Sequence, residues 1–147
     1  MLIAAPALAQ ASLDLRLADV GRYASFVDLT TLRWEGRVAH LRLLQVTEDG
    51  FTAAGEAYWG GWSVVTLDCA ARTVRHDGYA SIRSGGREGP LSGKPEAAVA
   101  IPPGSIEDAA AKVVCDGARP YATVPVTHSV EEAVRIGRPL IATGAEP

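Results

Sequence analysis

Cysteine is the residue type with the clearest capacity for covalent chemistry here, and the chain has two, Cys69 and Cys115. Cys69 ends a strand-like segment and Cys115 ends a predicted helix with an apolar face, so the thiols meet if this helix packs on that strand. In an exported protein we expect the pair to form a disulfide. Closing a loop of about 45 residues stabilises a fold by about 4 kcal/mol in the chain-entropy model, and by about half of that in practice.

Two other interpretations of the cysteines remain open. In a reducing cytosol, both would be buried free thiols. The other is a redox-active pair, although such pairs usually have Cys-x-x-Cys spacing with a lowered thiol pKa, and these two cysteines lie far apart in the sequence.

Side chains that commonly catalyse reactions or bind metals do not follow a recognised pattern. His40, His76 and His128 lack the His-x-His or His-x₃-His spacing of metal sites and have no acidic cluster nearby. There is no Gly-x-Ser-x-Gly motif for a nucleophilic serine. The glycine-rich segment 84–90 lacks the Gly-Lys-Ser/Thr ending of a phosphate loop. We therefore expect a protein that is not an enzyme, with no metal and no cofactor.

Three aromatic residues, Tyr58, Trp59 and Trp62, flank two glycines at the start of a predicted strand. Exposed aromatic side chains carry much of the energy of binding surfaces, so these three residues form the candidate binding surface of the sequence. The alternative is that the rings cover the edge of the sheet or pack under the C-terminal tail, because large aromatic side chains are usually well buried.

Composition predicts one soluble domain. The chain has 147 residues, of which 48% are hydrophobic, enough for a single small core. Its net charge of −3 comes from acidic and basic residues spread along the chain, without the basic stripe that nucleic acid requires. No apolar stretch is long enough to span a membrane. We expect neither a nucleic-acid partner nor a transmembrane segment.

The N-terminal residues 1–9 are typical of the end of a secretory signal peptide, with cleavage expected before Gln10. No cysteine follows the small residues Ala7 and Ala9, so a lipid anchor is not predicted. An apolar strand inserted into the sheet is the alternative for this segment. Residues 10–21 are interpreted as a lead-in, either disordered or forming one helical turn.

Strands are predicted where β-branched and aromatic residues gather or apolar and polar residues alternate. The turn at 48–50 and the short connection at 70–71 favour antiparallel pairing. We expect a turn with some helical twist over 29–36. The predicted strands cover residues 23–28, 37–47, 62–69, 72–82 and 97–101.

Two helices are predicted after the strands. Ser105 and Asp108 resemble a capping box, which indicates a helix from Ile106 to about Cys115 with Gly117 as its stop. A second short amphipathic helix is expected over 129–137, inside a proline-containing tail that covers 118–147 and that we interpret as an appendage.

Several of these segments together resemble the surface-adhesin protein E-like domain of Gram-negative bacteria. They are residues 23–33, the strand from Arg37, the Leu67–Thr73 stretch LDCAART, and the segment from Ile101 through IPPGSIE to Val114 and Cys115. The likeness covers about residues 20–117, and we place the domain at 22–117. It implies an antiparallel sheet packed on helices, a disulfide from strand to helix, and export. The eponymous adhesin is a surface lipoprotein that binds host matrix and serum proteins, whereas this chain lacks the lipid-anchor cysteine and continues beyond Cys115.

Together these observations predict an α+β fold: an antiparallel meander of four to five strands packed against a C-terminal helix, with one disulfide. The expected function is that of a non-catalytic, exported protein of the cell envelope, periplasmic or secreted, that binds another envelope or extracellular protein or has a structural role. The alternative is a small secreted hydrolase or a periplasmic ligand-binding protein with a groove between sheet and tail. A deep pocket with perturbed His or carboxylate groups favours the alternative, and an open aromatic face favours the binding module.

Overall fold

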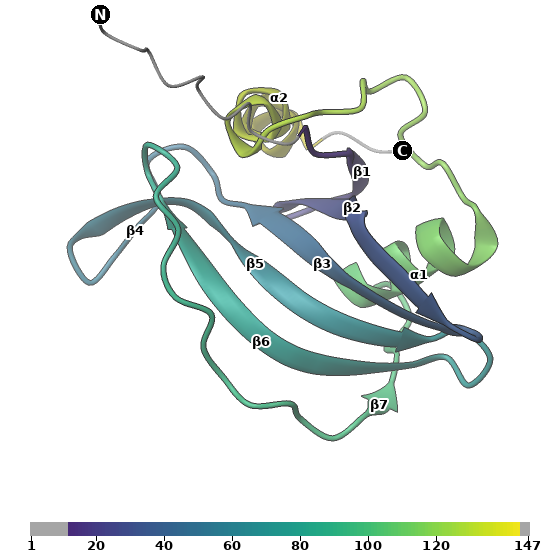
Figure 1. The fold of residues 1–147 in the computed structure, drawn as a ribbon. Helices are drawn as coiled ribbons and strands as arrows, with labels where there is room; N and C mark the ends of the chain where they lie inside the picture. The colour runs from purple at the N-terminus through teal and green to yellow at the C-terminus, as the bar shows by residue number, and fades with distance from the viewer. Residues whose placement is uncertain (1–11, 145–147) are drawn as a thin grey trace, which may run out of the picture.

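The computed structural model describes residues 12–144, so the predicted signal remnant at 1–9 lies outside the described residues. Figure 1 shows a curled sheet with one helix across its upper edge and another beside it. The strands are β1 (Leu15–Val20), β2 (Ala24–Glu35), β3 (Val38–Val46), β4 (Thr52–Ala53), β5 (Glu56–Asp68), β6 (Thr73–Arg83) and β7 (Val99–Ala100). The helices are α1 (Ile106–Asp116) and α2 (Val130–Thr143).

The sheet is antiparallel throughout, in the order β1-β2-β3-β5-β6-β7, with the short β4 paired to β5. The predicted meander is confirmed, but the strand number of four to five is too low. The additional first strand, β1, lies in the segment interpreted as a lead-in. Its Leu15 and Leu17 are buried, and it pairs antiparallel with β2, with one shift of register between Leu17 and Asp19.

Strand β2 also continues to Glu35 through the segment 29–36, where a turn was predicted. The chain turns only at Gly36 and Arg37, so the prediction is wrong for 29–35. Pairing with β3 is interrupted after Asp28 and resumes at Arg33, opposite His40. Hydroxyl groups bridge the interruption: the Oγ1 atom of Thr31 accepts a hydrogen bond from the Arg42 amide at 3.2 Å. The segment that was expected to turn therefore contains a bulge inside one long strand.

Helix α1 covers one face of the sheet, which we call the α1 face. Alternate strand residues point toward it, among them Leu41 and Leu43 of β3 and Val65 and Leu67 of β5. They pack against Ala110 and Ala111, both nearly fully buried in α1. The helix begins as predicted, because the Ser105 side chain accepts a hydrogen bond from the Asp108 amide at 3.1 Å.

The predicted disulfide joins Cys69, directly after β5, to Cys115 in the last turn of α1. Their Cα atoms are 5.5 Å apart. As the alternation of β5 requires, Cys69 follows Val65 and Leu67 on the α1 face, so the bond ties the end of a central strand to the end of the helix that covers it.

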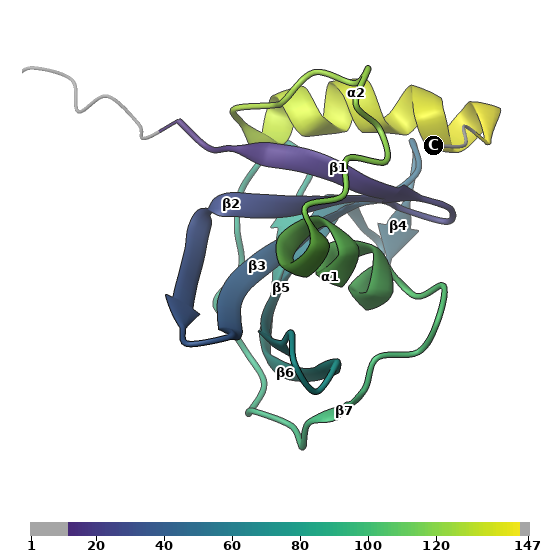
Figure 2. The ribbon, with the colours of Figure 1, turned by 90° about the vertical axis from the view of Figure 1, so that its right-hand side faces the viewer.

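Helix α2 covers the opposite face, the α2 face, where Phe26, Leu44 and Trp62 form a second core cluster with Ala133 and Val134. Figure 2 shows α2 running along β1 at the top of the view, with β1 and β2 lying between it and α1. The tail is thus part of the core rather than an appendage. Neither described helix is long and apolar enough to cross a membrane.

The helix of the tail is longer than the predicted segment 129–137. Gly137 does not stop it but lies buried against β2, where an added Cβ would come 2.9 Å from the Cβ of Ala24. Glycine here permits close packing of helix on strand. Arg138 then fixes the helix to the β3–β5 end of the sheet, because its guanidinium donates to the carbonyl oxygens of Thr47 and Tyr58 at 3.1 and 3.2 Å.

Removing the disulfide is expected to destabilise the fold. We expect the double substitution Cys69→Ser and Cys115→Ser to lower the free energy of unfolding by about 2–4 kcal/mol, because the unfolded chain regains the freedom of the closed loop. Urea denaturation followed by circular dichroism measures this loss. The wild type in excess reductant is the matched control and should unfold at the same urea concentration as the double variant; equal stability of reduced and oxidised wild type would contradict the assignment.

Candidate functional site

The three aromatic residues of the predicted binding surface do not lie on one surface. Trp62 is only 3% exposed and belongs to the core cluster under α2. Trp59 is half-buried and packs against the same cluster. Tyr58 lines an open groove, to which the otherwise buried Trp62 also contributes. The interpretation that the rings pack beneath the tail therefore describes the two tryptophans better than it describes Tyr58.

Trp62 is at the centre of a polar network on the α2 face. Its Nε1–H donates to the Oε1 atom of Glu88 at 2.8 Å, and the guanidinium of Arg42 lies 3.5 Å from the ring centroid. Arg42 in turn donates through Nε to the Oδ2 atom of Asp28, at 2.7 Å, and this carboxylate is fully buried. Trp62 thus links strands β2, β3 and β5 with the 84–90 loop and has a structural role.

On the α1 face, the strands run on beyond the helix and form an open groove that we call the tyrosine groove. Its cavity has a volume of about 340 Å³. Its lining contains five aromatic residues and a floor of small or uncharged residues: Tyr23, Phe51, Tyr58, Trp62, Tyr79, and among the floor residues Gln45, Gly61, Ser63 and Ser81. No residue that lines this cavity carries a charge.

The groove begins where the apolar character of the α1 face ends. Along β3 this face changes from Leu41 and Leu43, which α1 covers, to Gln45. Along β5 it changes in the same way, from Val65 to Ser63. The switch from large apolar to small polar residues on one face was readable in the sequence and marks the point at which helix coverage stops.

Tyr79 is the most exposed ring of the groove, with 42% of its surface accessible. Its position is fixed by stacking on His76, with ring centroids 5.8 Å apart and planes at 15°. The Nε2 atom of His76 lies 3.4 Å from the Oε1 atom of Glu107 in the first turn of α1. Burial, followed by the negative charges of Glu96 and Glu107, raises the pKa of the Tyr79 phenol, so the hydroxyl remains a hydrogen-bond donor near neutral pH.

The floor of the groove depends on two glycines in β5. The pairing of β5 with β6 is irregular between Tyr58 and Gly60. At Gly60 an added Cβ would lie 1.9 Å from the carbonyl oxygen of Gln45, and at Gly61 it would lie 3.1 Å from that of Ala80. The glycines between the aromatic residues therefore serve the close approach of neighbouring strands and leave the groove open above them.

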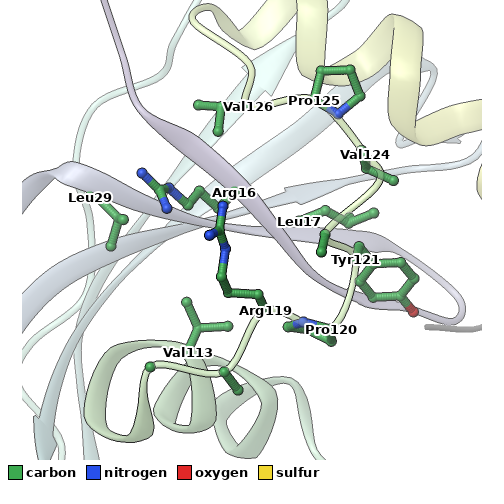
Figure 3. A pocket seen from close by; sticks show the side chains of 13 residues that line it. Arg16, Leu17, Leu29, Val113, Arg119, Pro120, Tyr121, Val124, Pro125 and Val126 are labelled. Carbon is green, nitrogen blue, oxygen red and sulfur yellow. The ribbon is translucent and has the colours of Figure 1, made fainter.

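A second cavity lies at the edge of the sheet, between β1, the end of α1 and the connection 117–126 (Figure 3). It has a volume of about 180 Å³. Two arginines, Arg16 and Arg119, line it together with apolar side chains such as Leu17, Leu29 and Val113. Neither arginine was singled out from the sequence, because they are 103 positions apart and only the fold brings them together.

The three histidines are separated from one another in the structure. His40 lies 3.1 Å from a carboxylate oxygen of Glu35, His76 faces Glu107, and Nδ1 of His128 contacts the backbone oxygen of Leu13 at 2.9 Å. Within residues 12–144, no group of three or more His, Cys, Asp or Glu side chains is arranged to hold a metal ion.

Comparison with solved structures identifies the fold of this chain. No family model and no curated protein matches the chain. Among solved structures, crystal form II of Haemophilus influenzae protein E superposes with a TM-score of 0.54 at 13% identity, covering 79% of this chain and 95% of that one. A second structure of protein E gives 0.53 at 13% identity, with 84% and 96% covered. The chain has the protein E fold. The resemblance to the surface-adhesin protein E-like domain is thus confirmed at the level of architecture.

The burial of Trp62 predicts a loss of stability when its ring is removed. Trp62→Ala should lower the free energy of unfolding by about 3–5 kcal/mol, because it leaves a cavity in the core and removes the ring that Arg42 and Glu88 contact. Tyr58→Ala should cost less than half as much, since its ring faces the groove. Urea denaturation of both variants measures the difference, and similar losses for the two would contradict the structural role of Trp62.

The close approach at Gly60 predicts a steep difference between glycines. Gly60→Ala should destabilise the fold by about 3 kcal/mol, because the new Cβ overlaps the backbone of β3. Gly61→Ala should have a smaller effect, since its nearest neighbour lies farther away. Gly21→Ala is the matched control because nothing lies within 4 Å of its added Cβ. Thermal unfolding ranks the three, and a Gly60 variant as stable as the Gly21 variant would refute the packing described.

Proposed function

We propose that this chain is a non-catalytic, exported protein of the cell envelope that binds another protein through the tyrosine groove. The observation that carries the proposal is an open, uncharged groove lined by Tyr23, Tyr58 and Tyr79 at the uncovered end of the α1 face. Tyrosine combines a large apolar area with a hydroxyl and loses little rotamer freedom on binding, which is why interfaces are rich in it.

The chemistry of the groove favours an apolar or aromatic segment of a polypeptide as its ligand. Because no charged residue lines it, association would gain little from electrostatic steering and would depend on burial of apolar surface. The exposed Tyr79 ring offers contact area, and the floor residues Gln45 and Ser63 offer hydrogen-bonding groups to a peptide backbone. A shallow floor suits an extended segment better than a small molecule, which usually occupies an enclosed pocket.

Export is supported by the covalent link between Cys69 and Cys115, since such bonds persist in oxidising compartments and are rare in the cytosol. The fold shared with protein E supports the same assignment to an exported envelope protein, periplasmic or secreted.

The alternative function, a small secreted hydrolase or ligand-binding protein, would use the cavity between sheet and tail. Hydrolysis requires a nucleophile with a base in hydrogen-bonding reach. The residues that line the tyrosine groove and the arginine-lined cavity include no histidine, cysteine or carboxylate. Both linings therefore support binding rather than catalysis.

The proposal is tested by recovery of partners from envelope extracts with the oxidised full chain. We expect at least one protein to be retained by the wild type and lost, by about tenfold or more, with Tyr79→Ala or Tyr58→Ala, because each ring contributes to a hot spot. Quantitative mass spectrometry of the retained proteins gives the measurement. Retention should change little between low and high salt, as expected for an uncharged surface.

Trp34→Ala is the matched control, because Trp34 is 46% exposed, similar to Tyr79, yet lies in β2 outside the groove. Its variant should retain the same proteins as the wild type. If the wild type and both tyrosine variants recover every protein equally, the groove is not the binding surface and the proposal fails.

A further inference from the structure

The chain between α1 and α2 must pass from one face of the sheet to the other, and it does so around the edge strand β1. Residues 117–126 form this crossing, and the second cavity lies beneath it. Figure 3 shows the Arg119 side chain extending from the crossing toward that of Arg16 on β1, with Val113, Leu17 and Leu29 around them. The cavity thus combines two guanidinium groups with apolar walls.

The two arginines leave this cavity with surplus positive charge. Arg16 is paired with Asp14, through contacts of 3.0 Å from Nε to Oδ1 and 3.4 Å from the second nitrogen to Oδ2, and this hydrogen bonding raises its pKa. The guanidinium of Arg119 forms no ion pair or hydrogen bond with any residue of 12–144. The carboxylate of Asp14 therefore neutralises only one of the two permanent positive charges, which belong to Arg16 and Arg119.

We propose that this cavity binds a carboxylate that carries one apolar group, either the C-terminal residue of a polypeptide or a free acid of the same kind. A guanidinium presents its N–H donors as a planar fork that matches the two oxygens of a carboxylate. Arg119 has all of its donors available, and the outward edge of Arg16 adds a second charge. The apolar side chains of Leu17, Leu29 and Val113 accept the group attached to the carboxylate.

The size of the cavity limits that group to about one side chain. An engineered cavity of about 150 Å³ holds a benzene molecule, and this one has a volume of about 180 Å³. A side chain such as that of leucine or phenylalanine fits this space, whereas a long acyl chain exceeds it. This site is separate from the tyrosine groove and goes beyond the function proposed for it.

A competing role for Arg119 has to be separated by the experiment. The residue follows the end of α1, where the backbone carbonyl groups carry partial negative charge that any nearby cation complements. A lysine would serve that role equally well, because it depends on charge alone. Bidentate binding of a carboxylate needs the fork of arginine, so Arg119→Lys distinguishes the two roles.

The test is a titration of the oxidised full chain with N-acetyl-L-phenylalanine, followed by heteronuclear NMR and calorimetry. We expect a dissociation constant on the order of 1 mM, as suits a ligand of this size, with shifts at Val113 and Leu17. The uncharged amide of the same compound and acetate, which lacks the apolar group, should each bind at least about tenfold more weakly. Equal binding of the amide, or no shift around the cavity, would overturn the proposal.

Variants identify the residues responsible. Arg119→Gln and Arg16→Gln should each weaken binding by about tenfold, and Arg119→Lys by several-fold. Arg135→Gln, which removes one exposed charge from α2 outside this cavity, is the matched control and should bind like the wild type. Wild-type affinity in all three variants of Arg16 and Arg119, even with lowered thermal stability, would assign these arginines to the fold alone and refute the site.

Two further ligands distinguish the sources of the carboxylate. A pentapeptide ending in phenylalanine that binds more tightly than phenylacetate would assign the site to polypeptide C-termini. Phenylacetate binding as tightly as the peptide, or more tightly, would assign it to free acids. In either case Arg119→Gln should weaken binding of the ligand by about the same factor. If this substitution leaves the affinity for both ligands unchanged, the proposal is contradicted.

Discussion

The covalent bond between Cys69 and Cys115 is the constraint from which the rest of the arrangement follows. It holds the last turn of α1 at the end of β5, so the helix can cover only the adjacent part of the sheet. An 11-residue helix is about 17 Å long, whereas a strand of 13 residues such as β5 extends over about 44 Å. Much of the α1 face therefore stays uncovered, and its uncovered end is the one farthest from Cys69, where the tyrosine groove lies.

The same bond determines the course of the tail. With Cys115 fixed on the α1 face, residues 117–129 have to cross the β1 edge before α2 can pack on Phe26 and Leu44. Backbone hydrogen bonds between Leu15 and Thr127, at 2.9 and 3.0 Å, pin the crossing to β1. A connection held at both ends arches over the strand between them, and the arginine-lined cavity is the space beneath that arch.

Sequence patterns predicted those parts of the fold that rest on local chemistry. The alternation from Arg37 to Thr47 and the cap at Ser105 each depend on a few neighbouring residues, and both are observed. The disulfide joins residues 46 positions apart, but a chain with only two cysteines offers a single pairing. The errors arose where residues distant in the sequence determine the local structure. Residues 10–21 contain β1 because its backbone pairs with β2 on one side and with Thr127 on the other. Helix α2 continues through Gly137 because Ala24 lies against this residue and leaves no room for a side chain. The composition of either segment does not reveal its partner.

The aromatic cluster shows why a binding surface is harder to predict than a fold. Tyr58 and Trp62 belong to one short segment, yet alternation and the irregularity before Gly60 send their rings to opposite faces. Tyr23 lies in the turn between β1 and β2, and Tyr79 lies in β6; both complete the groove and carry no local signal. Proteins that share 13% identity can share the sheet, but the shared backbone does not determine which side chains line the groove. The fold thus determines where α1 leaves the sheet open, whereas tyrosines from separate segments of the chain determine the chemistry of the opening.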